Sequence, residues 1–318
     1  MTSESVEMPM GTVTAAGKQQ LNLKKSKPGA GRSELGMALL FIAPATIGFL
    51  VFYLYPTIRG FYFSLTRYNL LGKPHFIGFD NYVKIASDKL FWNAIVVTLE
   101  YVFLNIVFQT IIAIGLAVLM QRLIKSTIIR GTILLPFMIS NVIAAMVWFW
   151  LLDYQIGLVN TFIDWIGLNR IPFFGGEHWA IPTIAAVNIW RHMGYTALLI
   201  FAGLQTIPHT TYEAAKVDGA SETRMFFGIT LPLLRPILGL VLIISVIGSF
   251  QVFDTVAVTT DGGPVDASRV LQLYIYDEAF GQFDFGYASA LSVAMLLILV
   301  VVTFFQYRVT RAGQTDLN

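Results

Sequence analysis

The chain has 318 residues, of which 56% are hydrophobic and only 13% are charged, and its mean hydropathy is +0.67. Soluble domains carry about 25% charged residues, so this composition excludes an ordinary soluble protein and predicts an integral membrane protein. The absence of cysteine excludes disulfides, thiol catalysis and Cys-ligated metal sites. The four histidines are scattered and the net charge of +2 is uninformative as a total. We predict no metal site, no cofactor and no nucleic-acid partner.

The two ends of the chain are polar. Residues 1–36 are low in aromatic residues and rich in lysine, which predicts a disordered cytoplasmic tail. This segment is not a signal peptide, because the first apolar run starts late and is about twice the usual length. Residues 310–318 are predicted to form a short cytoplasmic C-terminal tail.

Six apolar segments lie between these tails. A bilayer core of about 30 Å requires about 20 apolar residues as a helix, and each segment has that length. The segments are residues 37–58, 94–121, 131–152, 180–206, 236–258 and 286–307. Pro44, Pro136 and Pro182 fall early in their segments, where a missing N–H does least harm. The sequence therefore predicts an all-α polytopic membrane domain of six transmembrane helices over residues 37–309.

The positions of Lys and Arg predict the orientation. Most of these residues lie in the N-terminal tail, the 122–130 loop, the 207–235 loop and the C-terminal tail. Because cytoplasmic loops carry an excess of positive charge, both termini and the 207–235 loop are predicted to be cytoplasmic. The outer loops mix aromatic and turn residues, as in 76–82, 165–179 and 261–264. These either anchor at the bilayer surface or form a docking face for an external partner.

The 207–235 loop has the pattern of two short helices. Thr210 followed by Glu213 is a capping-box pattern for the first helix, and Asp218-Gly219 is a stop signal. Ser221 can cap a second helix that carries Arg224 and the apolar residues 225–227. Such a unit suits docking of a helix into a groove of a partner, although an amphipathic helix that only touches lipid is the plain alternative.

The spacing inside this loop is specific. Glu-Ala-Ala, three residues, Gly, nine residues and Ile-x-Leu-Pro occur at Glu213, Ala214, Ala215, Gly219, Ile229, Leu231 and Pro232. This pattern resembles the signature loop of the membrane (permease) subunits of binding-protein-dependent ABC importers, and the resemblance extends over about residues 37–309. Residues 76–82, 202–208, 260–264 and 286–290 are similar to the carbohydrate branch, in particular to the larger maltose-permease subunit. That subunit has extra N-terminal spans and a large periplasmic insertion, which this chain lacks.

The resemblance implies a type I ABC importer permease fold and a set of partners. These are a second, paralogous permease subunit, an ABC ATPase dimer, an extracytoplasmic solute-binding protein and a sugar substrate, all in a cell membrane. In the family, the loop helices sit in a cleft of the ATPase. The resemblance therefore implies ATPase coupling for Glu213, Ala214, Ala215, Asp218, Gly219, Arg224, Ile229, Leu231 and Pro232. The chain has no Walker A motif, so we predict that it is not itself an enzyme.

The fourth apolar segment carries polar residues at its middle: Asn188, Trp190, Arg191, His192 and Tyr195. An ionisable group at that depth faces a cavity or a partner by default. Similarity to the maltose-permease subunit places Arg191, His192 and Tyr195 at positions that touch sugar in that protein. Alternatively, Arg191 pairs with Asp254 or with a helix carbonyl and only packs the bundle.

The fifth apolar segment offers Ser245, Ser249, Gln251 and Asp254. Ser245 and Ser249 are four residues apart and share a helix face. By the same similarity they lie where the maltose permease meets its sugar, whereas the alternative is helix–helix packing through small residues.

Other functions fit less well. A membrane-embedded enzyme needs paired carboxylates, metal ligands or an activated serine, and the acidic residues in the apolar segments are isolated. A non-ABC secondary transporter or channel usually needs charged relays or broken helices, and only Arg191 stands out. Within the importer class, a permease for a glycerol phosphate or another polyol derivative stays open, because Arg191 could meet an anion.

Overall fold

The computed structural model describes residues 30–123 and 126–311, so most of the predicted N-terminal tail and the end of the C-terminal tail lie outside the described residues. The chain divides into two compact units that meet between Pro56 and Thr57. The first unit holds α1 (Ala30–Phe49) and the π-helix η1 (Leu50–Leu54), which continue into α2 (Tyr55–Ser64). Large apolar side chains of α1, such as Leu40 and Phe41, are exposed.

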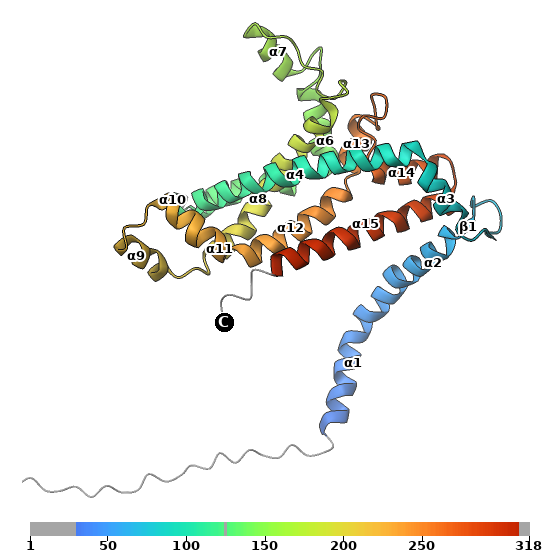
Figure 1. Cartoon of the computed structure of the whole chain (residues 1–318), viewed down its shortest axis with the longest axis horizontal. Coiled ribbons are helices and arrows are strands. Elements are labelled where there is room, and N and C mark those ends of the chain that lie inside the picture. Colours follow the sequence, from blue (N-terminus) through green and yellow to red (C-terminus); the bar gives the residue numbers. More distant parts are fainter. Residues whose placement is uncertain (1–29, 124–125, 312–318) are drawn as a thin grey trace, which may run out of the picture. The chain divides into compact units, whose positions relative to one another are not determined.

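The second unit is built on four long helices that lie side by side in Figure 1: α4 (Lys89–Arg122), α8 (Ala180–Leu204), α12 (Arg235–Phe250) and α15 (Phe285–Arg311). Asp88 starts α4, because its Oδ1 accepts hydrogen bonds from the backbone N–H groups of Leu90 and Phe91 at 2.9 and 3.4 Å. Such a cap satisfies donors that the first turn leaves without a partner.

Shorter elements close the two ends of this bundle. At one end, which we call the α9 end, lie α9 and α10; at the opposite end, the α3 end, lie α3, β1 and α14 (Figure 1). The bounds are β1 (Thr66–Arg67), β2 (His75–Phe76), α3 (Asp80–Ser87), α7 (Leu158–Trp165), α9 (His209–Val217), α10 (Glu222–Met225), η2 (Phe226–Thr230), α11 (Leu231–Leu233), α13 (Asp254–Thr259), α14 (Leu271–Tyr276) and η3 (Asp277–Gly281). The two strands pair antiparallel, with Thr66 opposite Phe76.

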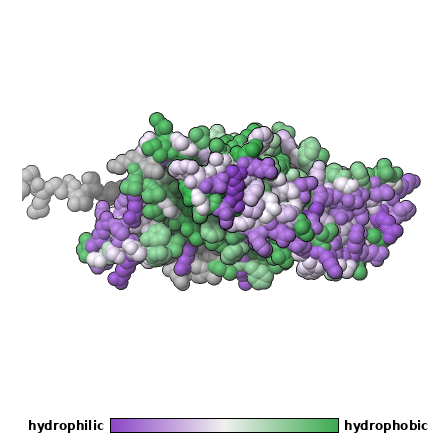
Figure 2. Space-filling model, turned by 90° about the horizontal axis from the view of Figure 1, so that it is seen from above, coloured by the Kyte–Doolittle hydropathy of each residue, from purple (hydrophilic) through white to green (hydrophobic). Residues whose placement is uncertain are grey.

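Buried side chains form two apolar clusters along the bundle. The larger cluster lies toward the α3 end and includes Tyr101, Phe250 and Tyr287, and the smaller lies toward the α9 end and includes Ile200 and Leu204. In Figure 2, hydrophilic side chains gather at the right-hand end, where α3 and β1 lie in Figure 1, and hydrophobic side chains are most frequent to the left of a hydrophilic patch at the centre. Many large apolar side chains of the long helices are exposed, among them Phe103 and Phe305, which suits contact with lipid.

The third apolar segment is not one straight helix. It forms α5 (Thr127–Met138) and α6 (Asn141–Leu151), which meet at 89°. The break lies at Ile139 and Ser140, whose ψ angles of 139° and 144° are extended rather than helical. The prediction of a continuous helix through Pro136 is therefore wrong, and the helix stops within one turn after that proline.

Within the described ranges, four helical segments are long and apolar enough to cross a membrane: Gly36–Ser64, Lys89–Arg122, Arg235–Thr259 and Phe285–Val309. The bent α5–α6 pair adds a fifth if it counts as one span. The predicted fourth span is α8, a continuous helix of 25 residues. The polar residues Asn188, Arg191 and His192 interrupt its apolar sequence but not the helix. A mostly helical membrane fold is thus confirmed, with the short strands β1 and β2 as the departure from the predicted all-α class, and the number of six spans stays a prediction.

Candidate functional site: a surface loop and a central cavity

The 207–235 loop folds into two short helices, as its sequence predicts. The first, α9, begins at His209, two residues earlier than expected: Pro208 precedes it, and no side chain caps it. The predicted capping box of Thr210 and Glu213 is therefore not formed, because Thr210 already lies in the first turn. The second helix, α10, has the predicted cap, since Ser221 Oγ accepts from the N–H of Arg224 at 3.3 Å.

Gly219 ends α9 in the left-handed backbone region, with φ of +75°. Its N–H donates to Lys216 O at 3.0 Å, and the N–H of Ala220 donates to Ala215 O at 2.9 Å. These bonds provide donors for carbonyls at the end of the helix that have no helical partner. A glycine in this position usually permits such bonds. No other group lies within 4 Å of the place of a Cβ at Gly219, so backbone conformation, and not space, requires glycine.

The residues of the motif divide into an exposed and a packed set. Glu213, Ala214, Asp218, Gly219 and Arg224 are exposed, whereas Ile229, Leu231 and Pro232 are half-buried in the helix that leads to α12. Among the described residues, Glu213 has no side-chain hydrogen bond or ion pair. A carboxylate on a surface helix that has no partner among the described residues is available to another protein.

One ion pair joins this loop to α4, and two further contacts hold its own parts together. Glu222, at the start of α10, pairs with Arg122 at the end of α4 (2.7 Å) and with Lys216 on α9 (3.8 Å). The hydroxyl of Tyr212 lies 3.1 Å from Oγ1 of Thr230. The loop is therefore tied to the end of α4, and within the loop α9 is tied to the segment that leads into α12.

A cavity of about 350 Å³ lies between α4, α8 and α12. This volume falls within the range of small-molecule sites, about 300–1,000 Å³. The predicted residues Asn188, His192, Tyr195, Ser245, Ser249, Gln251 and Asp254 all line it, together with Tyr101, Asn105, Gln109, Phe137, Asn141, Thr196, Leu199, Val241, Ile244, Gly248, Val252, Phe253 and Thr255. Trp190 and Arg191 are not among the lining residues. We call this space the central cavity.

A chain of polar side chains crosses one wall of the central cavity. Asn105 Nδ2 on α4 donates to Ser249 Oγ on α12 at 2.9 Å and to Gln109 Oε1 at 3.1 Å. Gln109 Nε2 in turn donates to Thr196 Oγ1 on α8 at 2.7 Å. This network of three helices was not predicted. The signal was available, because Asn105 and Gln109 are amides four residues apart on one face of an apolar helix.

Aromatic side chains form another wall of the central cavity. The rings of Phe137 and Tyr195 stack with centroids 4.5 Å apart, and the ring of His192 lies edge-on to Phe137. His192 Nδ1 lies 2.9 Å from Asn188 O, and its Nε2 lies 2.9 Å from Nη1 of Arg191. Because the carbonyl requires a proton on Nδ1 and Arg191 donates, the imidazole is in the neutral Nδ1–H form.

Arg191 binds the break between α5 and α6. Its Nε donates to Ile139 O at 2.7 Å and its Nη2 donates to Phe137 O at 3.1 Å. These carbonyls lie at the end of α5, where helical partners are missing. Asp254 instead accepts from Asn141 Nδ2 at 3.1 Å. Of the two interpretations of Arg191, this geometry favours the bond to helix carbonyls. Trp190 packs edge-on against Trp148, with centroids 5.5 Å apart.

Two buried amide oxygens at the central cavity have no hydrogen-bond partner among the described residues. They are Oδ1 of Asn105 and Oδ1 of Asn141. A buried acceptor without a partner costs about 1–3 kcal/mol. Each is therefore able to accept a hydrogen bond from a hydroxyl group of a solute or from water.

At the α3 end, a single carboxylate ties three elements together. Asp88 Oδ2 accepts hydrogen bonds from the hydroxyls of Tyr274 on α14 and Tyr287 on α15, both at 2.5 Å. Partial burial alone would raise the pKa of Asp88, but the bonds from both tyrosines and from the N–H groups of Phe91 and Leu90 hold it below its ordinary value. Burial and the bond to Asp88 raise the pKa of Tyr274.

A bundle of membrane-crossing helices, with a polar cavity at its middle and an exposed helical loop at one end, defines the membrane subunit of a transporter. The chain belongs to the family of binding-protein-dependent transport system inner membrane components, which it matches over residues 93–312. It is a multi-pass membrane protein and a component of a transport system.

Similar transport proteins support this assignment. The chain is 35% identical to the sulfoquinovosyl glycerol transport system permease protein of Agrobacterium fabrum (86% of this chain, 90% of the relative). It is 31% identical to the trehalose/maltose transport system permease protein of Thermococcus litoralis (87% and 95%). A solved bacterial ABC transporter, involved in the import of alginate, matches with a TM-score of 0.77 and 27% identity over 89% of this chain and 96% of that one.

Proposed function

We propose that this chain is one of two paralogous membrane subunits of an ABC importer, and that it forms part of the path for a sugar or oligosaccharide. A solute-binding protein delivers the solute to the α3 end. An ATPase dimer binds the loop at the α9 end and supplies the energy. In this proposal residues 37–309 form six spans, and both termini and the 207–235 loop are cytoplasmic.

The observation that carries the carbohydrate assignment is the lining of the central cavity. It brings amide groups of Asn105, Asn141 and Asn188 and the hydroxyl of Ser245 beside the stacked rings of Phe137 and Tyr195. Hydroxyl groups of a sugar need such donors and acceptors, and its C–H face needs an aromatic ring. Transport permeases for trehalose and maltose and for arabinooligosaccharides are 31% and 30% identical to this chain, which agrees with the proposal.

A phosphorylated polyol is the second candidate, because the sn-glycerol-3-phosphate permease of Rhizobium meliloti is 30% identical to this chain. The cavity argues against it. None of the described residues that line the cavity is Lys or Arg, whereas Asp254 is acidic. Arg191, the residue that could meet an anion, is bound to the carbonyls of Phe137 and Ile139. We therefore favour a neutral solute.

The test is uptake by the reconstituted transporter. The chain would be co-expressed with the second permease subunit, the ATPase and the binding protein from the same gene cluster, and the complex placed in proteoliposomes with ATP inside. Labelled trehalose, maltose, arabinotriose and sn-glycerol 3-phosphate would be compared. We expect ATP-dependent uptake of a neutral sugar. Uptake of the phosphate alone would refute the carbohydrate assignment, and transport by this chain alone against a gradient would refute the importer class.

The coupling role has its own test. Glu213 is exposed and unpartnered among the described residues, so Glu213→Lys should leave folding unchanged while it reverses the charge that the ATPase would meet. We expect loss of uptake and of sugar-stimulated ATP hydrolysis at matched expression. Glu177→Lys is the control, since Glu177 is also exposed but lies at the loop before α8. Normal uptake by the Glu213 variant would refute the coupling role.

A further inference from the structure

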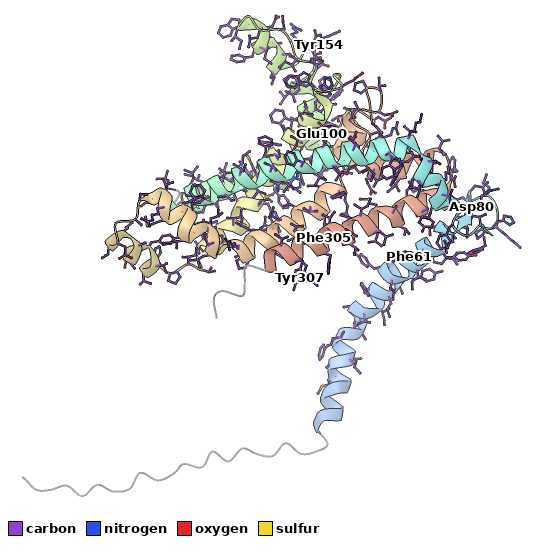
Figure 3. All side chains as sticks on the ribbon, in the orientation of Figure 1. Phe61, Asp80, Glu100, Tyr154, Phe305 and Tyr307 are labelled. Carbon is purple, nitrogen blue, oxygen red and sulfur yellow. The ribbon has the colours of Figure 1, made fainter. Side chains whose placement is uncertain are left out.

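A second cavity, of about 450 Å³, lies at the C-terminal end of α6. Its walls come from the end of α6 and the turn after it, from the loop before α8 and from the turn after α13. We call this space the outer pocket. Figure 3 shows Tyr154, one of its lining residues, in the projecting segment that carries α7.

The outer pocket combines aromatic rings with a fixed carboxylate. The rings of Phe149 and Phe174 lie 5.4 Å apart at its wall, and Tyr154 is 51% exposed. Asp153 lies beside them, and the N–H groups of Ile156 and Gln155 lower the pKa of its carboxyl, so it stays ionised at neutral pH. Aromatic faces beside a carboxylate match the C–H face and the hydroxyl donors of a sugar ring.

The walls of the outer pocket are held in place before any ligand arrives. Asp153 Oδ1 accepts from Gln155 N at 2.8 Å and from Ile156 N at 2.9 Å, and within the described ranges its Oδ2 has no partner. On the other wall, Ser268 Oγ contacts Gly263 O at 2.6 Å and Thr260 Oγ1 at 2.8 Å. A pre-formed site binds more tightly, because less ordering accompanies binding.

The loop before α8 is fixed by a buried asparagine. Asn160 Nδ2 donates to Ile171 O at 3.0 Å and to Asp153 O at 3.1 Å, and Asn160 Oδ1 accepts from Ile171 N at 2.8 Å. Asn160 is fully buried. These bonds connect the turn after α6 to the loop before α8, and so set the distance between the two walls that carry Tyr154 and Phe174.

The outer pocket and the central cavity lie at opposite ends of one pair of helices. α6 and α13 pack against each other. Asn141 and Asp254, at their starts, line the central cavity and are hydrogen-bonded to each other, whereas Phe149 and Thr259, toward their ends, line the outer pocket. At 1.5 Å per residue, the six residues of α13 span only about 9 Å.

We propose that the outer pocket is a second carbohydrate subsite, which holds a sugar ring outside the central cavity on the way in. The inference rests on the proposed function, since it assumes that the solute is a sugar. Asp153 Oδ2 accepts hydrogen bonds from sugar hydroxyls, and Tyr154 and Phe149 cover the C–H face of the ring. Because only the short helix α13 separates the outer pocket from the central cavity, one oligosaccharide is able to occupy both spaces at once.

Variants that each carry one introduced cysteine test this inference, because the chain has no cysteine of its own. Gly175→Cys places a thiol at the rim of the outer pocket, where a Cβ meets no other atom within 4 Å. Ser245→Cys reports on the central cavity. Trp165→Cys is the control, because Trp165 on α7 is 80% exposed and lies outside both spaces. Maleimide labelling would be measured on the complete reconstituted transporter, with the neutral sugar that gives uptake.

At a sugar concentration about ten times Kd, we expect labelling of the Gly175 and Ser245 variants to slow about tenfold, with the Trp165 variant unchanged. Adding Asp153→Asn, which keeps an oxygen for the turn, should lower the sugar affinity at Gly175 about tenfold. Protection at Ser245 but not at Gly175 overturns the subsite and leaves the function intact, whereas protection at neither overturns both. Equal protection at Gly175 by the empty binding protein also overturns the subsite, because it marks a docking face.

Discussion

Arg122 and Glu222 form an ion pair of 2.7 Å between the last residue of α4 and the first residue of α10. The pair joins a helix that lines the central cavity to the loop that carries the family motif. α4 supplies Asn105 and Gln109 to the cavity wall, so a displacement of α10 has a direct route to that wall. This ion pair therefore connects the loop with the family motif to a helix of the cavity wall.

The first prediction concerns this pair. Glu222→Gln should leave folding nearly unchanged, because an exposed ion pair contributes only about 0–1 kcal/mol. Sugar-dependent ATP hydrolysis should fall several-fold relative to basal hydrolysis, because the loop loses a tie to α4. The exchanged pair Arg122→Glu with Glu222→Arg should restore part of the coupling. The idea fails if the single and exchanged variants couple equally well.

The second prediction concerns Gly219. Because its φ is +75°, Gly219→Ala forces an L-residue into the left-handed region, at a cost of about 1–2 kcal/mol. Uptake at matched membrane levels should fall, and Gly219→Pro should abolish it. Gly228→Ala is the matched control, because Gly228 lies in the helical part of the same loop and also has free space. Equal effects of the two alanine variants would contradict the conformational argument.

The third prediction concerns Asn105 and Ser249. Asn105→Ala removes the donor to Ser249 and leaves Gln109 short of a partner, so we expect a loss of about 1–3 kcal/mol of stability. The half-saturating sugar concentration should also rise. A double-mutant cycle with Ser249→Ala, followed by thermal unfolding in detergent, should give a coupling energy above about 0.5 kcal/mol. Strict additivity would show that the hydrogen bond has no energetic weight.

The fourth prediction concerns pH and Asp88. The pKa of Asp88 is lower in the folded protein than its ordinary value of 3.8, so its contribution to stability is complete above that value. It is lost as the pH falls through the lower folded-state pKa. Asp88→Asn should lower the unfolding temperature at neutral pH, and the difference from the wild type should shrink in acid.

Asp80→Asn serves as the control for this experiment, because Asp80 is an exposed carboxylate at the start of the neighbouring helix α3. Its unfolding temperature should match that of the wild type at both pH values. A constant difference between Asp88→Asn and the wild type from neutral to acid pH would argue that the ionised form of Asp88 contributes nothing.

Local signals in the sequence predicted local structure well. The cap at Ser221 and the stop at Gly219 depend on a few neighbouring residues, and both are confirmed. The predicted start of α9 was wrong by two residues, since the helix already begins after Pro208 and Thr210 lies in its first turn. Seven of the nine residues predicted for the substrate path do line the central cavity, because a resemblance to a family carries over positions on helices whose packing is shared.

The errors arose where the outcome depends on distant contacts. No glycine lies at the break between Ile139 and Ser140, so the local sequence does not predict it. The carbonyls that the break exposes are bound by Arg191, which lies on another helix. The partners of Asn105 lie on α4 itself and, far along the chain, on α12. The spacing within α4 shows that Asn105 and Gln109 share a face, but it cannot reveal the bond to Ser249, because that bond forms only when the helices pack.

The bond between Arg191 and the two carbonyls has a practical consequence for anyone who wants to redirect this protein to a new cargo. Arg191 is an obvious first choice for randomisation, because it is the charged residue in the middle of its segment. However, its hydrogen bonds hold α8 to the end of α5, and it does not line the central cavity. A library that varies Ser245 and Gln251 and keeps Arg191 fixed should yield altered selectivity. One that varies Arg191 should yield mainly misassembled protein.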